Sequence, residues 1–122
     1  IAAISEILER DLIRHGREMG QHLKARLEAM AEKFGIFGDI RGKGLFLGIE
    51  FVRNPVTKER FPANPGFGIR VGRRALEYGL LTRFDPHWLA VGPALIVTAE
   101  HIDEIVATLD RCIGEVLETV NG

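Results

Sequence analysis

The sequence predicts an α+β fold, a two-layer sandwich in which a small, mostly antiparallel sheet carries helices on one face. Long segments at both ends of the chain repeat apolar residues every three to four positions, which is typical of amphipathic helices. Short runs between them alternate in polarity, which is typical of strands with one buried face. Glycine and proline separate these runs and mark the turns and loops between them.

Length and composition favour one soluble globular domain, because 122 residues with 46% hydrophobic and 27% charged side chains suit a single core. The formal net charge of −1 provides no basic surface, so we expect neither nucleic acid nor an anionic membrane as a partner. No apolar run approaches the roughly 18 residues of a membrane-spanning helix. The single cysteine, Cys112, excludes an internal disulfide and favours a reducing, cytoplasmic location.

Residues 1–34 carry the first helical pattern. Its apolar positions are Ile1, Ile4, Leu8, Leu12, Met19, Leu23, Leu27, Met30 and Phe34. We expect a break near Arg10 and Asp11, with Asp11 capping a second segment, and a helix end at Gly35. Because the chain opens at Ile1 within this pattern, without methionine or a capping residue, we expect a fragment of a longer protein.

Residues 38–51 predict a hairpin with its turn at Gly42, Lys43 and Gly44, since glycine tolerates positive φ. The second strand is expected to place Leu45, Leu47, Ile49 and Phe51 on one face and Phe46, Gly48 and Glu50 on the other. The Gly-Lys-Gly turn lacks the spacing of a phosphate-binding loop and leads into a strand rather than a helix. We therefore interpret it as a plain hairpin turn.

A loop over 53–65 and a helix over 67–78, ended by Gly79, are expected next. Gly68 and Gly72 lie four residues apart on this helix. Because each glycine costs about 1 kcal/mol in a helix relative to alanine, we expect them to permit close packing on the sheet.

The last third of the sequence predicts a strand over 80–84, a turn at 85–86 and a returning strand over 88–91. A short apolar run follows at 95–97. Thr98 is a good N-cap for the final helix, and Glu100 in its first turn is favourable toward the helix dipole. The apolar face of that helix carries Ile102, Val106, Leu109, Ile113, Val116 and Val120.

Arg83 is the residue whose setting points to chemistry. It ends an apolar strand, and Phe84 and Trp88 flank it in the following turn. A guanidinium at such a strand end can present a planar fork to a carboxylate. The alternative is that Arg83 pairs with Asp85 or Glu50, or is simply solvated.

The other reactive side chains form no recognisable catalytic or metal-binding pattern, so we expect no catalytic residue and no metal site in this chain. Four histidines are expected at the surface: His15, His22, His87 and His101. Cys112 lies beside Leu109 and Ile113 on a helical face and is expected in the core rather than as a nucleophile.

Three motifs occur in order along the chain. They are Arg41-Gly42-Lys43-Gly44-Leu45-Phe46-Leu47-Gly48-Ile49-Glu50, Gly79-Leu80-Leu81-Thr82-Arg83, and Pro93-Ala94-Leu95-Ile96-Val97-Thr98 followed by an acidic helix start. Together they resemble the C-terminal small domain of class III, pyridoxal-phosphate-dependent aminotransferases, the ω-aminotransferase group. Ala94 departs from the family, which commonly has a second proline there. The resemblance covers essentially all of the sequence and implies that residues 1–34 lead in from a preceding large domain.

The resemblance also implies what the parent protein does. It implies a homodimer with pyridoxal phosphate that transfers an amino group from an amine or ω-amino acid to pyruvate or a similar keto acid. Arg83 then occupies the place of a mobile arginine that binds the substrate α-carboxylate and swings away when an amine without that group binds.

The lysine that forms the Schiff base belongs, in that family, to the large domain. None of the lysines of this chain lies in a sequence setting that suits this role: Lys24, Lys33, Lys43 and Lys58. We therefore expect the fragment alone to bind no cofactor and to be inactive.

If the large domain is missing, the Phe46 and Gly48 face of the hairpin and part of helix 1–34 should expose apolar surface. Two alternatives stay open on the sequence alone. One is a standalone α+β module that binds a small carboxylate or a partner protein, and the other is an oligomerisation domain.

Overall fold

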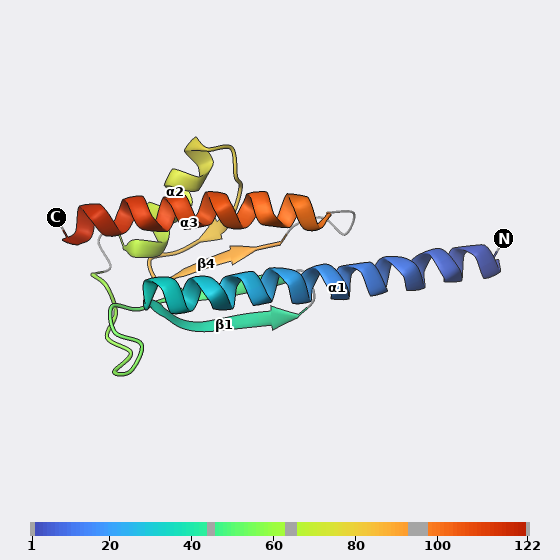
Figure 1. The fold of residues 1–122 in the computed structure, drawn as a ribbon, viewed down its shortest axis with the longest axis horizontal. Coiled ribbons are helices and arrows are strands. Elements are labelled where there is room, and N and C mark those ends of the chain that lie inside the picture. The colour runs from blue at the N-terminus through green and yellow to red at the C-terminus, as the bar shows by residue number, and fades with distance from the viewer. Residues whose placement is uncertain (1, 44–45, 63–65, 93–97, 122) are drawn as a thin grey trace.

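The computed structural model describes residues 2–43, 46–62, 66–92 and 98–121 (Figure 1). Within these residues the elements are α1 (Ala2–Phe34), β1 (Phe37–Lys43), β2 (Phe46–Phe51), α2 (Phe67–Glu77), β3 (Arg83–Phe84), β4 (Trp88–Val91) and α3 (Ala99–Asn121). The predicted turn residue Gly44 and the predicted apolar run 95–97 lie outside the described ranges, as does Ala94. The other two residues of the predicted turn, Gly42 and Lys43, are not in a turn but end β1, where they pair with Leu47 and Phe46 of β2. No helix in the described part of the chain is both long and apolar enough to cross a membrane.

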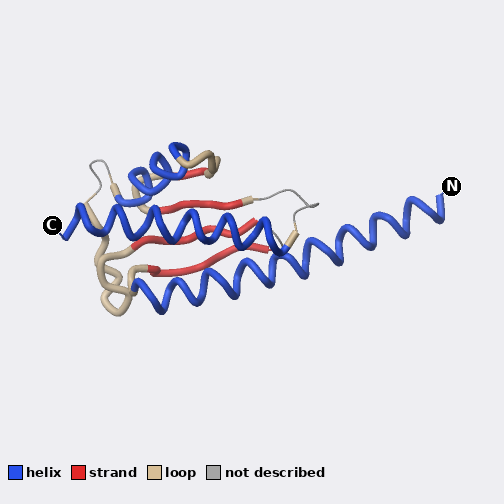
Figure 2. Tube along the Cα trace, turned by 45° about the horizontal axis from the view of Figure 1, so that its top comes forward, coloured by secondary structure: helices blue, strands red, loops and turns tan. Residues whose placement is uncertain are grey.

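The strands form one antiparallel sheet in the order β1-β2-β4-β3. α1 and α3 run side by side along one face of this sheet, and α2 lies beside α3 over β3 and β4 (Figures 1 and 2). Side chains of β2 alternate between buried positions and more exposed ones. The predicted α+β two-layer fold is therefore confirmed, with one face of the sheet left open.

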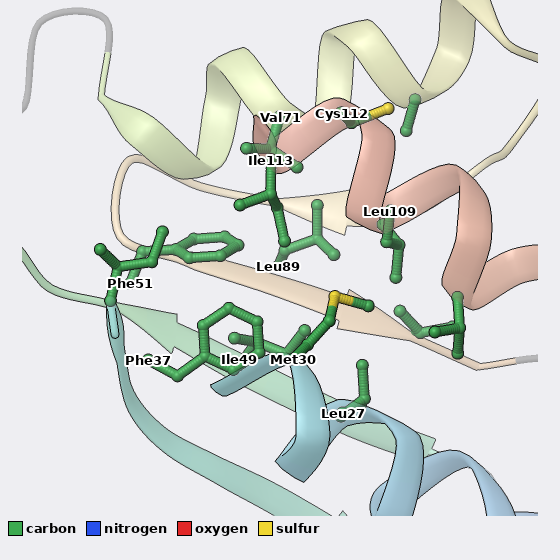
Figure 3. Close-up of a cluster of buried hydrophobic side chains, with 14 of the residues drawn as sticks. Leu27, Met30, Phe37, Ile49, Phe51, Val71, Leu89, Leu109, Cys112 and Ile113 are labelled. Carbon is green, nitrogen blue, oxygen red and sulfur yellow. The ribbon is translucent and has the colours of Figure 1, made fainter. Parts of the chain in front are cut away.

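The hydrophobic core lies between the helices and the sheet (Figure 3). β2 contributes Leu47, Ile49 and Phe51 to it, as the alternation predicted. The ring of Phe51 lies 5.0 Å from that of Phe67, which in turn stacks on Phe61 at 4.5 Å. The helices add buried side chains that include Leu23, Leu27, Met30, Val71, Ile102, Leu109, Cys112 and Ile113.

The predicted break in the first helix is wrong, since α1 continues without interruption past Arg10 and Asp11. Asp11 does not cap a new segment but lies 3.9 Å from Arg14, one turn further on. An aspartate inside a helix costs only a few tenths of a kcal/mol, too little to interrupt a segment rich in good helix formers. The helix ends as predicted at Gly35, which has a φ of 66°.

The first half of α1 extends beyond the sheet (Figure 2). Leu12 and Ile13 on this half are 42% and 60% exposed, and Phe46 on the open face of the sheet is 55% exposed. The predicted exposure of apolar side chains on the open face and on part of the first helix is therefore confirmed.

The predicted strand over 80–84 is only two residues long, Arg83–Phe84, and the end of α2 explains why Leu80 is not part of it. Gly79, with a φ of 85°, closes the helix as predicted. The amide of Leu80 then donates to the carbonyl of Ala75 at 2.8 Å, and the amide of Gly79 donates to that of Leu76 at 3.0 Å. This Schellman-type cap uses the Leu80 amide, so it is not available to a strand ladder.

Gly68 and Gly72 pack against the sheet as predicted. A Cβ atom on Gly68 would lie 2.2 Å from the carbonyl oxygen of Asp85, and one on Gly72 would lie 2.1 Å from the ring of Phe84. Both contacts are far closer than any real side chain allows. The two glycines therefore set the distance between α2 and the β3–β4 hairpin, which carries Arg83.

Candidate functional site

A single row of residues crosses the whole sheet and ends in an arginine on either side. Arg41 on β1 is paired with Gly48 on β2, Gly48 with Ala90 on β4, and Ala90 with Arg83 on β3. Neighbouring strands are about 4.8 Å apart, so the Cα atoms of the two arginines are separated by roughly 14 Å. The row has two small residues at its centre and a cation at each end.

Two aromatic side chains border this small centre. The ring of Trp88 lies over Gly48, where an added Cβ would be 3.6 Å from the indole. The ring of Phe46 lies against Gly92, where an added Cβ would be 3.0 Å away. Because Gly48 has no side chain, the guanidinium of Arg41 can extend across it to within 5.3 Å of the Trp88 ring.

Arg83 is exposed and lies between two depressions of the open face. The larger has a volume of about 410 Å³ and is lined by Phe46, Leu81, Thr82, Arg83, Ala90 and Gly92. The smaller, of about 190 Å³, is lined by Arg83, Phe84, Asp85, Trp88 and Ala90. The strand therefore places the guanidinium where a small molecule on the open face would meet it.

The acids that could neutralise Arg83 are engaged elsewhere. Glu50 lies 3.8 Å from Arg60. The carboxylate of Asp85 accepts hydrogen bonds from the backbone amides of His87 at 2.8 Å and Trp88 at 2.7 Å. Within the described ranges no carboxylate pairs with Arg83, so the alternative that it is bound to Asp85 or Glu50 is wrong.

The arginine at the other end of the row is in a different state. Arg41 donates to the carboxylate of Asp39 through its Nε, and this hydrogen bond lowers the pKa of Asp39 below its ordinary value. The same contact raises the pKa of Arg41, because it stabilises the charged guanidinium. Arg41 is thus charged and ion-paired with Asp39, whereas all the N–H groups of the Arg83 guanidinium are available to a ligand.

The β3–β4 turn is held firmly, which fixes the strand that carries Arg83. The amide of Gly68 at the start of α2 donates to the carbonyl of Pro86 at 3.1 Å, and the amide of Phe51 donates to that of His87 at 2.8 Å. Next to Arg83, the hydroxyl of Thr82 is buried without a hydrogen-bond partner among the described residues. A free guanidinium on a fixed strand beside an open depression can bind a carboxylate.

The remaining reactive side chains have structural roles. His22 contacts Asp103 at 2.8 Å across α1 and α3, and the Nδ1 atom of His101 accepts a hydrogen bond from the backbone amide of Thr98 at 3.3 Å. Cys112 is fully buried, and burial raises the pKa of its thiol to about 11, so its predicted place in the core is confirmed.

The histidines predicted at the surface are half-buried at His15, His22 and His87 and exposed at His101. At the β3–β4 turn, the Nδ1 atom of His87 is buried without a partner among the described residues. No group of three or more His, Cys, Asp or Glu side chains in the described part of the chain is arranged to hold a metal ion.

The sequence pointed to Arg83, with Trp88 near it, and placed Phe46 on the open face, but it did not predict the contact between Arg41 and Trp88. These two residues are 47 positions apart, and only the register of β1, β2 and β4 brings them together. The one signal in the sequence was Gly48, whose missing side chain allows the contact.

Comparison with known proteins identifies the family. The family described as class-III aminotransferase matches residues 1–113. A leucine/methionine racemase from Thermococcus litoralis is 36% identical over 97% of this chain and 26% of its own length. A taurine–pyruvate aminotransferase from Bilophila wadsworthia is 37% identical over 87% of this chain and 25% of its own.

Solved structures of transaminases also match this chain. An omega transaminase from Pseudomonas jessenii, determined in complex with PMP, matches with a TM-score of 0.85 and 31% identity over 96% of this chain and 26% of its own. A transaminase from the marine bacterium Virgibacillus matches with a TM-score of 0.86 and 26% identity, over 96% of this chain and 27% of its own. The chain spans about a quarter of the length of these proteins. On both sequence and structure, it belongs to the class-III aminotransferase family.

Proposed function

We propose that this chain is the small domain of an aminotransferase that moves an amino group from an amine or ω-amino acid to pyruvate or a similar keto acid, and that Arg83 binds the carboxylate of the acid. The observation that carries this proposal is the free state of Arg83. It is exposed beside two depressions, while Glu50, Asp39 and Asp85 on the same face are engaged with other partners. An unpaired guanidinium in that place favours a ligand that brings its own carboxylate.

Class-III aminotransferases depend on pyridoxal phosphate. A lysine that holds this cofactor needs a desolvated setting that lets it lose its proton. Lys33 is paired with Asp110 at 2.9 Å, Lys58 donates to the carbonyl of Gly38, and Lys24 is exposed. These three side chains do not fit that requirement, so our proposal assigns the cofactor lysine to a large domain of the parent protein.

The exposed apolar side chains support a large domain as the partner. Leu12 and Ile13 on α1, and Phe46 and Leu81 on the open face, are each more than one-third exposed. Exposed large apolar side chains of this kind are a common feature of contact sites. In this proposal the large domain covers some of these side chains, and the complete enzyme is a homodimer that acts on small molecules.

Two of the relatives favour different reactions for the parent protein. The Bilophila wadsworthia relative is a taurine–pyruvate aminotransferase, which favours an ω-amino donor and pyruvate as acceptor. The Thermococcus litoralis relative is a leucine/methionine racemase, which makes amino-acid racemisation the second candidate reaction. The two reactions differ in a simple respect, since racemisation consumes no keto acid.

The experiment that tests the assignment of the cofactor compares this 122-residue chain with the full-length protein. Both are incubated with pyridoxal phosphate and treated with borohydride, which fixes a cofactor bound through lysine, and the labelled peptide is identified by mass spectrometry. We expect label only in the full-length protein, on a lysine outside residues 1–122. Label on Lys24, Lys33, Lys43 or Lys58, or no label in either protein, would overturn the assignment.

A further inference from the structure

We infer that Asp85 is a positioning residue for the proposed reaction: its carboxylate holds the turn after β3 so that Arg83 stays in place and free of an internal partner. This inference rests on the proposed function and adds a second residue to the same site. It comes from the hydrogen bonds of the β3–β4 turn and from the short strand that carries Arg83.

Few hydrogen bonds determine where Arg83 lies, because β3 is a two-residue strand at the edge of the sheet. Arg83 is paired with Ala90 and Phe84 with Leu89 on β4. Before β3, the amide of Leu80 is already used by the cap of α2. The position of Arg83 therefore depends mainly on the turn that follows it.

Asp85 closes that turn with both its backbone and its side chain. Its amide donates to the carbonyl of Trp88 at 3.0 Å. In the other direction, one oxygen of its carboxylate accepts the amides of Trp88 at 2.7 Å and His87 at 2.8 Å. Since hydrogen-bonded pairs alternate along an antiparallel ladder, the next such pair after Asp85–Trp88 is Arg83–Ala90. The Asp85 side chain thus completes the hydrogen-bonded pair next to the one that carries Arg83.

The other contacts of the turn hold its tip rather than β3. The amide of Gly68 donates to the carbonyl of Pro86 at 3.1 Å, and the amide of Phe51 donates to that of His87 at 2.8 Å. Neither hydrogen bond involves a residue of β3. Asp85 is therefore the link between the anchored tip of the turn and the strand that carries Arg83.

The same hydrogen bonds keep the charge of Asp85 from pairing with Arg83. The two residues line the smaller depression together, yet they form no ion pair. On β1, Asp39 and Arg41 have the same spacing of two residues and do form one. Hydrogen bonds from amides to a carboxylate are charge-assisted, and they compete well with a solvent-exposed ion pair. Asp85 held by two amides therefore leaves Arg83 to an external carboxylate.

The test uses the full-length holoenzyme with an amine donor and pyruvate, and kcat/KM is determined for each substrate. Asp85→Ala should lower kcat/KM for pyruvate about tenfold and that for the amine less than about twofold, since a misplaced binding group can cost up to about a hundredfold. Asp85→Asn keeps an oxygen that accepts the same two amides, so kcat/KM for pyruvate should stay within about twofold of that of the unmodified enzyme.

Two further variants separate the hydrogen bonds of Asp85 from its charge. Asp85→Glu keeps the charge, but its longer side chain loses the geometry of the turn and becomes available to Arg83, so kcat/KM for pyruvate should fall at least about tenfold. Asn54→Ala is the matched control, because the Oδ1 atom of Asn54 accepts the amides of Val56 at 2.9 Å and Thr57 at 3.3 Å in a loop that lines neither depression beside Arg83. It should leave both values unchanged.

A double-mutant cycle shows whether Asp85 acts through Arg83. If it does, Asp85→Ala in an Arg83→Ala background should change kcat/KM for pyruvate less than about twofold, because the group that it positions is already gone. A general loss of structure would instead lower kcat/KM for pyruvate about tenfold again and would lower the value for the amine with it.

Several results would overturn the inference. These are an equal loss for pyruvate and the amine in Asp85→Ala, an equal loss for pyruvate in Asp85→Asn and Asp85→Ala, unchanged kinetics in Asp85→Glu, or additive losses in the cycle. If Asp85→Ala does not fold, the comparison of Asp85→Asn with Asp85→Glu decides, because one keeps the hydrogen bonds and the other keeps the charge.

The failure of this inference can be distinguished from failure of the proposed function. If Arg83→Ala lowers kcat/KM for pyruvate but no Asp85 variant does, only the role of Asp85 is wrong. If neither Arg83→Ala nor Asp85→Ala changes kcat/KM for pyruvate, the role of Arg83 is wrong as well. If the unmodified enzyme transfers no amino group to any keto acid, the proposed function and this inference fail together.

Discussion

Replacing Arg83 with alanine in the full-length enzyme is expected to lower kcat/KM for keto acids and α-amino acids about 30- to 300-fold, with much smaller losses for simple amines. Removing one partner of a charged hydrogen-bonded pair typically costs about 2–5 kcal/mol, and each 1.4 kcal/mol is about tenfold. We expect the lower half of that range because Arg83 is exposed rather than deeply buried. Steady-state kinetics with an amine and an α-amino acid as alternative donors measures the difference.

Two further variants define the role of Arg83. Arg83→Lys keeps the charge but loses the planar fork, so it should recover only part of the loss. Arg73→Ala is a matched control, since Arg73 is an exposed arginine on α2 that lines neither of the two depressions beside Arg83. An equal loss on amines and acids in Arg83→Ala would contradict a role in carboxylate binding.

Replacing Gly68 with alanine is expected to destabilise the domain by about 1–3 kcal/mol, the usual cost of overpacking. The Cβ atom would come within 2.2 Å of the Asp85 carbonyl oxygen and 2.7 Å of the Trp88 carbonyl oxygen. Both are backbone atoms, so no side-chain rotation can relieve the contact. Urea unfolding of the chain measures the free energy of unfolding.

Gly114→Ala is the matched control for this prediction. It makes the same substitution inside α3, where the nearest atom to the new Cβ is 4.0 Å away in the ring of Phe34. Alanine should stabilise α3 by up to about 1 kcal/mol through its higher helix propensity. If Gly68→Ala were also stabilising, the close approach of α2 to the β3–β4 turn would be wrong.

Local patterns of the sequence predicted much of the fold because their causes are local. The alternation of β2, the helix ends at Gly35 and Gly79 and the cap at Thr98 each depend on a few neighbouring residues. The break expected at Asp11 failed because a capping residue does not end a helix when its neighbours all favour one.

The short β3 strand and the composition of the site could not be predicted in this way. The cap at the end of α2 takes the amide of Leu80, and this competition between helix and strand appears only once the chain is folded. The free state of Arg83 likewise depends on the folded positions of other residues, since Glu50 on β2 pairs with Arg60 in the loop that follows. A motif can locate such an arginine but cannot say which acids are already engaged.

The most direct test of the proposed function is amino transfer by the full-length holoenzyme from an amine donor to pyruvate. Alanine and the carbonyl product of the donor are quantified together, with the stereochemistry of added alanine followed in a parallel sample. We expect the two products in equal amounts, with turnover that requires pyruvate. Racemisation of alanine without consumption of pyruvate, or no amino transfer to any keto acid, would contradict the proposed function.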